Sequence, residues 1–378
     1  MSRRHIVTLA DIAAQCGVTK VTVSRALRDP ARHSAALTQR IQQVAQELGY
    51  DPDKNLGAQR MAMRKYGQEV INHLVAMVFP PDYSKAHYFT ALHDGITDVL
   101  SKEGYGLLMV KSPYLESGFL PACFHRGEID GLIIYEDPMC AAQVLRQLQG
   151  ETPFGQRPVV SLISATDGCS SVLANQQQGA YDALTYLLDL GHRHFLYIHG
   201  RVPNQQIASP VAQGWSGYRQ ACAEKGYDPD RHLFTVPFGN ELWEMALGAA
   251  GHLYLNSVAG DVRFVRHPLI RTLRKHPEIT AVLTPNDASA ILAYHILQTA
   301  GYRVPEDISL IGFDDTDPLV VTRKRNILTT VHLPLEAVGR ASAKLLIDRI
   351  TGKITQDITK TLPTTLVVRE TTAPPPPQ

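Results

Sequence analysis

Residues 17–27, GVTKVTVSRAL, constrain the fold of the amino-terminal end more than any other stretch of the chain. Thr19, Val21, Thr22 and Val23 are β-branched, so propensity alone favours a strand here. The stretch nevertheless lies between two segments whose apolar residues recur with the period of a helix. We therefore expect a short helix that is held in place by tertiary packing, which overrides its weak intrinsic propensity.

Caps and apolar stripes predict three short helices in the first fifty residues. Thr8, Thr19 and Ser34 stand where helix N-caps are expected, and Gly17 and Gly49 stand where the first and third helices end. The stripes consist of Leu9, Ile12, Ala13 and Cys16 in the first helix, Val23, Ala26 and Leu27 in the second, and Leu37, Ile41, Val44, Ala45 and Leu48 in the third. Three short helices with a tight glycine-containing turn between the first two predict a helix-turn-helix.

The opposite face of the second helix carries side chains suited to a DNA major groove. It presents Lys20, Val21, Ser24, Arg25 and Arg28. Arginine can bond O6 and N7 of guanine, an apolar side chain can contact a thymine methyl group, and a hydroxyl can bond phosphate. This face therefore indicates DNA binding. The alternative is an amphipathic helix of a small bundle in which Val21 is a stray exposed residue.

Charged residues are divided unevenly along the 378-residue chain. Residues 1–65 hold 11 Lys/Arg and 5 Asp/Glu, a net charge of +6, whereas the remainder holds 26 and 31, a net charge of −5. A basic amino-terminal piece joined to an acidic body favours a nucleic-acid-binding head on a separate domain over a basic tail without a function.

The composition also favours a cytoplasmic protein without membrane contact. The five cysteines are scattered and form no Cys-x-x-Cys pair, which fits a reducing compartment. The first residues lack the apolar segment of a secretory signal, and the longest apolar run, Leu74 to Phe79, is too short to span a bilayer. The proline-rich end, residues 373–378, is expected to be disordered.

The first fifty residues resemble the DNA-binding head of the LacI/GalR family of bacterial transcription regulators. The resemblance is carried by the Thr-Leu-x-Asp-Ile-Ala opening, the Thr-Val-Ser-Arg run at residues 22–25 and the Leu-Gly-Tyr-x-Pro sequence at residues 48–52. It implies that Lys20, Val21 and Arg25 read bases. Phosphate contacts are implied for Thr8, Thr19, Thr22 and Ser24, and the expected DNA-binding set of the head is completed by Leu9 and Arg28.

The segment that follows the head, residues 54–71, departs from the family pattern. In the family it folds into a short helix on DNA and inserts a leucine pair into the minor groove, where such apolar wedges kink a base step. The usual pattern is Pro-Asn-x-x-Ala-Arg/Gln-x-Leu, but the chain reads PDKNLGAQRMAMR, with Gln59 at the wedge position. A two-residue slip would make Leu56 or Met61 the wedge, and Arg60 is expected to meet phosphate with or without the slip. The alternative is a linker that orders without intercalating.

From residue 72 onward, short apolar runs alternate with helical stretches. This alternation predicts an α/β core of parallel sheets, built from βαβ units in two doubly wound halves. The order of the segments resembles the periplasmic-binding-protein-like core of the same family, so the chain is expected to cross between subdomains near Arg201, Thr329 and Lys353. The expected division is an all-α helix-turn-helix head at 1–53, a hinge at 54–71, and a core at 72–372 with an N-subdomain of about 72–200 and 329–352 and a C-subdomain of about 201–328 and 353–372.

Asp287 is the leading candidate for binding a small molecule in the core. It follows a predicted strand and begins a predicted helix, which is where open α/β sheets bind ligands. The resemblance implies that this carboxylate bonds a sugar hydroxyl or a base nitrogen; a helix N-cap is the alternative.

The resemblance implies further ligand contacts, although the aromatic residues among them are equally well explained by core packing. These candidates are Tyr88, Phe89, Asn175, Trp215 and Phe238. Trp215 stands in a stretch where family members usually have an arginine, so a clamp for an anion is unsupported. A neutral sugar, an unusual ligand and no ligand at all remain open.

Together these observations predict a ligand-responsive transcription regulator, with repression favoured over activation. The expected partners are a pseudo-palindromic double-stranded DNA operator, a small-molecule effector of carbohydrate type, and further copies of the chain in a homodimer or a tetramer. Catalytic motifs are missing, no cofactor is implied, and His192, His194 and His199 are not expected to bind a metal. The alternatives are a solute-binding protein for import and a cytoplasmic small-molecule-binding protein or enzyme on a doubly wound fold.

Overall fold

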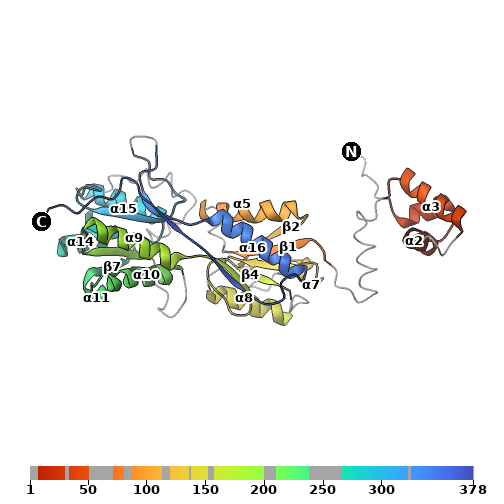
Figure 1. The fold of residues 1–378 in the computed structure, drawn as a ribbon, viewed down its shortest axis with the longest axis horizontal. Helices are drawn as coiled ribbons and strands as arrows, with labels where there is room; N and C mark the ends of the chain where they lie inside the picture. Colours follow the sequence, from red (N-terminus) through yellow and green to blue (C-terminus); the bar gives the residue numbers. More distant parts are fainter. Residues whose placement is uncertain are drawn as a thin grey trace. The chain divides into compact units, whose positions relative to one another are not determined.

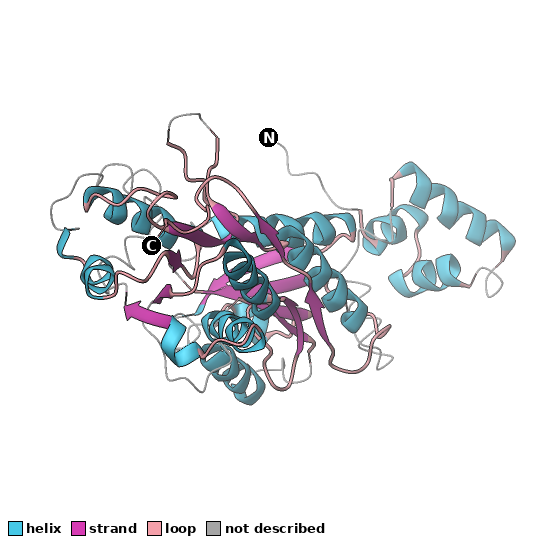
Figure 2. Ribbon diagram, turned by 60° about the vertical axis from the view of Figure 1, so that its left-hand side comes forward, coloured by secondary structure: helices cyan, strands magenta, loops and turns pink. Residues whose placement is uncertain are grey.

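The computed structural model divides the chain into two compact units, Met1–Asn72 and His73–Gln378 (Figures 1 and 2). No helix among the described residues is both long enough and apolar enough to cross a membrane. The structure describes residues 7–29, 34–50, 71–80, 87–112, 120–135, 138–151, 157–199, 210–237, 265–321 and 325–377.

The first unit contains the three predicted helices, α1 (Leu9–Cys16), α2 (Lys20–Arg28) and α3 (Ala35–Glu47). α1 ends at Gly17, whose φ of 67° is the left-handed conformation that glycine adopts without a steric penalty. Gly49 follows α3 with a φ of 68°. The helix-turn-helix expected from the sequence is therefore confirmed.

Each helix of this unit starts at the predicted cap. Thr8 and Asp11 form a capping box, in which the Asp11 carboxylate accepts the Thr8 amide at 2.7 Å. The Thr19 hydroxyl accepts the Thr22 amide at 3.2 Å, and the Ser34 hydroxyl caps α3. These caps satisfy amides that have no partner within the helix, which lets a segment of weak propensity begin a helix at a defined residue.

Burial of one face of α2 stabilises this helix, whose β-branched residues have a weak intrinsic helix propensity. Val23 and Ala26 of α2 are fully buried against Ile12 of α1 and Ile41 of α3. Val21, on the other side of α2, is 57% exposed. The β-branched residues of this segment are thus divided between a small core and an open face, as the periodicity predicts.

The second unit holds two six-stranded sheets, and the first of them is wholly parallel. Its order is β11-β5-β4-β3-β1-β2. The strands are β1 (Leu74–Phe79), β2 (Gly106–Lys111), β3 (Gly131–Ile134), β4 (Val159–Ser161), β5 (Ser170–Ala174) and β11 (Thr359–Leu362). The helices α5 (His87–Lys102), α7 (Ala122–His125), α8 (Pro138–Glu151) and α16 (Leu335–Ile350) complete the first subdomain.

The second sheet has the order β12-β10-β9-β8-β6-β7, in which only β12 runs antiparallel to its neighbour. Its strands are β6 (Phe195–His199), β7 (Leu233–Pro237), β8 (Ala281–Leu283), β9 (Ser309–Asp314), β10 (Thr329–His332) and β12 (Thr365–Val367). The second subdomain also contains α9 (Gln176–Leu190), α10 (Pro210–Glu224), α11 (Pro229–His232), α14 (Pro268–Lys275) and α15 (Asp287–Thr299). Two doubly wound halves are confirmed.

The crossings between the two sheets lie at other residues than expected. β6 pairs with β7 and β8, so the first crossing follows β5 at Asn175 and not at Arg201. β10 belongs to the second sheet, which moves the second crossing from Thr329 to the segment after His332. The expected subdomain limits near residues 200, 328 and 352 are therefore wrong. Sheet membership depends on pairing between distant strands, which apolar runs alone do not reveal.

The third crossing also lies later than expected. β11 pairs with β5 and β12 pairs with β10, so the chain crosses at residues 363–364 and not at Lys353. There it lies beside the first crossing, because the Asn175 amide donates to the Leu362 carbonyl at 2.9 Å. The Thr364 hydroxyl donates to the Asn175 carbonyl at 3.1 Å. Two of the three connections are thus hydrogen-bonded to each other.

The carboxyl-terminal end is ordered up to residue 377, in contrast to the expected disorder of residues 373–378. The Thr371 hydroxyl donates to the Leu310 carbonyl at 2.7 Å, and the Ala373 amide donates to the Ser309 hydroxyl at 3.0 Å. Buried His192 lies 2.7 Å from the Thr280 hydroxyl and 2.9 Å from the Ala373 carbonyl. The composition of the tail suggested disorder. It could not reveal this anchoring, because the hydrogen-bond partners of the tail lie far away in the sequence.

This anchoring predicts unequal effects for two truncations. Deleting residues 374–378 removes the prolines and should change the unfolding free energy of the core by less than about 1 kcal/mol. Deleting residues 371–378 also removes at least five hydrogen bonds, each worth about 0.5–1.5 kcal/mol, and should cost about 3 kcal/mol or more. Urea unfolding followed by tryptophan fluorescence measures both, since both tryptophans lie in the second unit. Equal midpoints for the two truncated proteins would contradict the anchoring.

Candidate nucleic-acid interface and ligand-binding region

The open face of α2 is built from one apolar side chain between two cations. Lys20, Val21 and Arg25 are exposed, and in the described part of the chain neither cation has a hydrogen bond or an ion pair. Thr22 and Ser24 are half-buried, and the Thr19 and Thr22 hydroxyls lie 2.9 Å apart. The face therefore offers free guanidinium and ammonium donors beside an apolar contact, which is the combination that reads base edges.

The remaining residues predicted to contact DNA are either engaged within the first unit or outside what the structure describes. Thr8 is engaged in the capping box of α1, and Leu9 is partly buried against the core of the first unit. Arg28 ends α2, but its side chain is outside what the structure describes. Leu56, Arg60 and Met61 lie outside the described residues, so the wedge and the phosphate contact of the hinge remain hypotheses from the sequence.

The two valines of α2 give a matched test of this division. Val23→Ala should destabilise the first unit by about 1–3 kcal/mol, since the removed methyl groups leave a cavity. Val21→Ala should change stability by less than about 0.5 kcal/mol, because this side chain is mostly exposed. Amide hydrogen exchange of peptides from α1 and α3 measures both effects. A loss of protection in Val21→Ala as large as in Val23→Ala would contradict the assignment of the faces.

The Asp287 carboxyl is buried, and both of its oxygens accept hydrogen bonds from other residues of the core. It is the first residue of α15, whose N-cap is Asn286 and not Asp287. Its Oδ2 accepts the amides of Thr316 at 2.8 Å and Asp317 at 3.4 Å, and its Oδ1 accepts the Thr330 hydroxyl at 2.5 Å. Only 1% of Asp287 is exposed. The carboxyl therefore holds the segment after β9 rather than facing open solvent.

This burial has an electrostatic consequence. It raises the pKa of Asp287 to about 8, although the three hydrogen-bond donors act in the opposite direction. Desolvation, and then the neighbouring carboxylates of Asp287 and Asp317, raise the pKa of Asp314 well above its usual range. A neutral carboxyl at Asp287 removes its part of the repulsion on Asp314.

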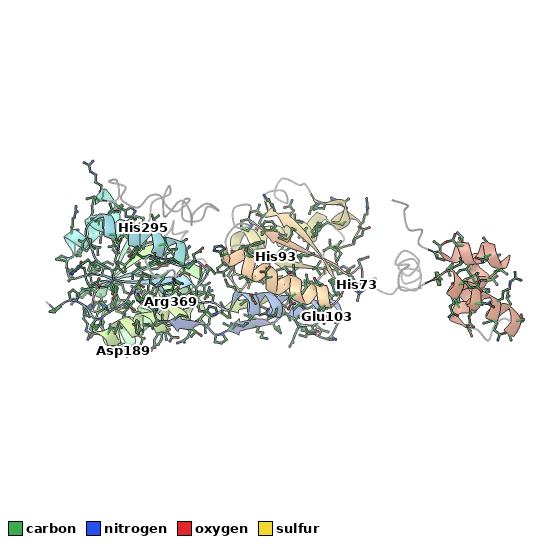
Figure 3. The ribbon with its side chains drawn as sticks, turned by 90° about the horizontal axis from the view of Figure 1, so that it is seen from above. His73, His93, Glu103, Asp189, His295 and Arg369 are labelled. Atoms are coloured by element: carbon green, nitrogen blue, oxygen red, sulfur yellow. The ribbon has the colours of Figure 1, made fainter. Side chains whose placement is uncertain are left out.

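The residues around Asp287 form a segment that the sequence did not single out. Asp314 and Asp315 have φ values of 99° and 59°, a left-handed conformation that costs energy in residues with a Cβ. Asp315 lies 2.8 Å from the Arg369 guanidinium and 3.3 Å from His332. Figure 3 shows Arg369 in the second subdomain. The Asp-Asp-Thr-Asp run at the end of a predicted strand was the available signal for this cluster.

The predicted aromatic residues of the core lie in two separate groups. Phe89 is buried, with ring centroids 5.1 Å from Phe79 and 5.5 Å from Tyr135, whereas Tyr88 is half-buried at 6.0 Å from Tyr135. Trp215 stacks on Tyr197 at 5.5 Å in the second subdomain. Asn175 caps α9 at the first crossing by accepting the Gln178 amide at 3.1 Å, and Phe238 lies outside the described residues.

The histidines of the core, which were not expected to bind a metal, have other contacts. No group of three or more His, Cys, Asp or Glu side chains among the described residues is arranged to hold a metal ion. His192 is committed to Thr280 and Ala373, and His194 packs beside His232 at a centroid distance of 4.7 Å.

The raised pKa of Asp287 predicts a pH-dependent stability. Between about pH 4 and pH 8 the folded chain keeps a proton that the unfolded chain releases, so the unfolding free energy falls as the pH rises through this range. The slope is at most about 1.4 kcal/mol per pH unit. Asp287→Asn should lack this contribution, because the amide does not titrate. Urea unfolding of both proteins from pH 5 to pH 8 tests this, and parallel profiles would contradict it.

Comparison with known proteins agrees with this geometry. The fold and the open α2 face define a helix-turn-helix regulator with a periplasmic-binding-protein-like core. Residues 8–53 match the model for bacterial regulatory proteins of the lacI family, and residues 184–372, half of the chain, match the periplasmic binding protein-like domain. The chain belongs to the LacI family of bacterial regulatory proteins, and it is a DNA-binding transcription regulator rather than an enzyme.

Relatives resemble the chain over nearly its whole length. The regulator CelR of Thermobifida fusca is 28% identical over 378 residues, covering 98% of this chain and 99% of CelR. GntR of Escherichia coli K12 is 27% identical over 347 residues, covering 91% and 92%. The solved CelR–cellobiose complex has a TM-score of 0.60 at 24% identity and covers 97% of this chain and 99% of that chain. The lac repressor dimer bound to operator and the anti-inducer ONPF has a TM-score of 0.62 at 20% identity, covering 98% and 100%. At these identities the two solved structures support the fold.

Proposed function

We propose that this regulator binds an operator through α2 and that a carbohydrate, bound between the two subdomains of the core, sets its operator affinity. The observation that carries the DNA part is the α2 face, where Val21 is 57% exposed between two cations that have no partner among the residues the structure describes. In a major groove, Arg25 would bond a guanine, Lys20 would bond an acceptor on a base, and Val21 would contact a thymine methyl group. Repression, by occupying the operator, is favoured over activation.

Phosphate contacts would fix the position of α2 on the duplex without reading sequence. Thr8, Thr19, Thr22 and Ser24 supply hydroxyls at or near the amino-terminal ends of α1 and α2, where phosphate is also favoured by the helix dipole. Two heads of a homodimer would read two half-sites of a pseudo-palindrome, separated by whole turns of the duplex. Access to chromosomal DNA places the protein in the cytoplasm. The lac repressor relative is a dimer on its operator.

The carbohydrate part rests on the core. In doubly wound sheets a ligand binds beyond the carboxyl ends of the strands, where Asp287, Tyr88 and Asn175 are found in this chain. Half-buried Trp215 and Tyr88 offer rings of the kind that sugars stack on, and Phe238 would add a third. Phe89 and Asp287 would shape the wall from behind, since both are buried. The CelR relative is solved with cellobiose and a LacI-family regulator of Enterococcus faecium with ribose.

Control of DNA binding would follow from differential affinity. A sugar that contacts both subdomains favours one angle between them over another, and the hinge at 54–71 orders on DNA in only one of these arrangements. The sugar then shifts the population of the DNA-binding state by as much as its affinity for the two states differs.

Arg25→Ala separates base reading from general attraction to DNA. Loss of a bidentate guanine contact costs about 1–3 kcal/mol, so operator affinity should fall about 5- to 150-fold. Affinity for a random duplex should fall no more than about threefold. Arg40→Ala is the charge-matched control, because Arg40 is exposed on α3, and it should affect both duplexes equally. Fluorescence anisotropy at one fixed salt concentration gives all values, and equal losses in Arg25→Ala would reduce Arg25 to a phosphate contact.

The ligand is tested together with the operator. Genomic DNA fragments retained by the purified full-length protein are sequenced with no sugar, with cellobiose and with ribose. We expect one pseudo-palindromic sequence to be enriched, and one of the two sugars to release it. Enrichment that no sugar alters would leave the DNA function in place but contradict a cellobiose or ribose effector. Retention without any sequence preference would contradict operator recognition.

A further inference from the structure

Among the described residues, a polar contact away from the connecting segments joins the two subdomains directly. His87 begins α5, which packs on α16 in the first subdomain, and Asp317 follows β9 in the second. The Nδ1 atom of His87 lies 2.8 Å from Oδ1 of Asp317, although the two residues are 230 positions apart in the sequence. Nδ1 can donate this hydrogen bond from a neutral imidazole or from an imidazolium, so the contact does not require a charged histidine.

The position of Asp317 is imposed by its surroundings. Its segment, residues 314–317, starts with two residues at positive φ, a conformation that persists only where other contacts hold it. Arg369 holds Asp315 at 2.8 Å, and Asp287 holds the amides of Thr316 and Asp317. Release of Asp287 would free the segment to relax, and Asp317 would then no longer face His87.

The strand beneath this segment is shaped to admit the Asp287 carboxyl. A Cβ built at Gly312 of β9 would overlap Oδ1 of Asp287, so only glycine leaves the carboxyl in its observed place. The Thr330 hydroxyl of β10 fixes the same oxygen from the neighbouring strand. β9, β10 and α15 therefore fix Asp287 together, and Asp287 in turn fixes the segment that reaches the first subdomain.

We propose that His87 and Asp317 form a latch between the two subdomains, and that Asp287 is a positioning residue which holds the latch segment, residues 314–317. The latch stabilises the arrangement of the subdomains seen in this structure. Its regulatory consequence rests on the proposed function: a sugar that prefers this arrangement gains from the latch, and one that prefers another arrangement must break it.

The latch is tested first by substitutions in the full-length protein without sugar. His87→Ala and Asp317→Ala should each raise the unfolding equilibrium constant of the core about fivefold, as expected for one hydrogen bond of about 1 kcal/mol between partly exposed side chains. The double variant should be no worse than either single one. His93→Ala is the matched control, since His93 lies on α5 beside Asp94 and should not couple to Asp317→Ala. Additive effects of His87→Ala and Asp317→Ala would overturn the latch.

The positioning role of Asp287 is tested by measuring the effect of His87→Ala in proteins that carry different residues at position 287. In an Asp287→Ala background, His87→Ala should have almost no further effect, because Asp317 has already left its position. In an Asp287→Asn background the fivefold effect should return, since the amide oxygen can accept both backbone amides and its NH₂ can donate to Thr330. A merely structural Asp287 would leave the His87→Ala effect unchanged in all backgrounds and overturn the proposal.

Two further measurements keep the test decisive. If Asp287→Ala does not fold, Gly312→Ala displaces the same carboxyl and should likewise abolish the effect of His87→Ala. Titration of operator complexes with cellobiose should then show a midpoint shifted by up to about fivefold in His87→Ala but not in His93→Ala. An unshifted midpoint, with the coupling in ligand-free protein intact, would overturn the regulatory consequence. Failure of cellobiose to act on the unsubstituted protein would contradict cellobiose as the effector, and the latch would then be judged by the coupling alone.

Discussion

The constraint on which the core depends is that the chain passes between its two sheets three times. The first and third passages are hydrogen-bonded to each other through Asn175, Leu362 and Thr364. The first sheet consequently ends in β11, which follows β10 of the second sheet in the sequence, and the second sheet ends in β12, which follows β11. Neither subdomain can fold from a continuous segment, so the two are fixed to each other at the crossings.

This arrangement explains where polar residues gather. Each passage ends or begins a strand at the same side of a sheet, and there the sequence places Asn175, Asp314 and His332. A directional contact such as that between His87 and Asp317 contributes to the angle between the two halves, because one hydrogen bond of about 1 kcal/mol changes the ratio of two arrangements about fivefold. The small energies suit a molecule that has to change arrangement.

Local features were predictable from the sequence, and long-range ones were not. The caps at Thr8, Thr19 and Ser34, and the exposure of Val21, follow from neighbours within a few positions. The strands and helices of the core follow from apolar periodicity in the same way. The crossings do not, because whether β6 joins the first or the second sheet is decided by pairing with strands much further along the chain.

The candidate ligand residues show the same limit. Asp287 could be singled out because it follows a strand and begins a helix, but its partners Thr316 and Thr330 lie on other elements. The sequence therefore indicated an important carboxyl without its orientation. His87 gave no signal, since its partner is 230 positions away. The anchored end at Thr371 and Ala373 was hidden by the prolines that follow it, whose composition resembles that of a disordered tail.

The central claim, that sugar and operator act on one equilibrium between subdomain arrangements, has a direct test in thermodynamic reciprocity. The affinity of the full-length protein for cellobiose is measured by calorimetry with and without saturating operator, and operator affinity is measured with and without saturating cellobiose. The account predicts that the two ratios are equal, because one coupling free energy links both sites. A sugar affinity that operator DNA does not change, while the sugar changes operator affinity, would contradict it.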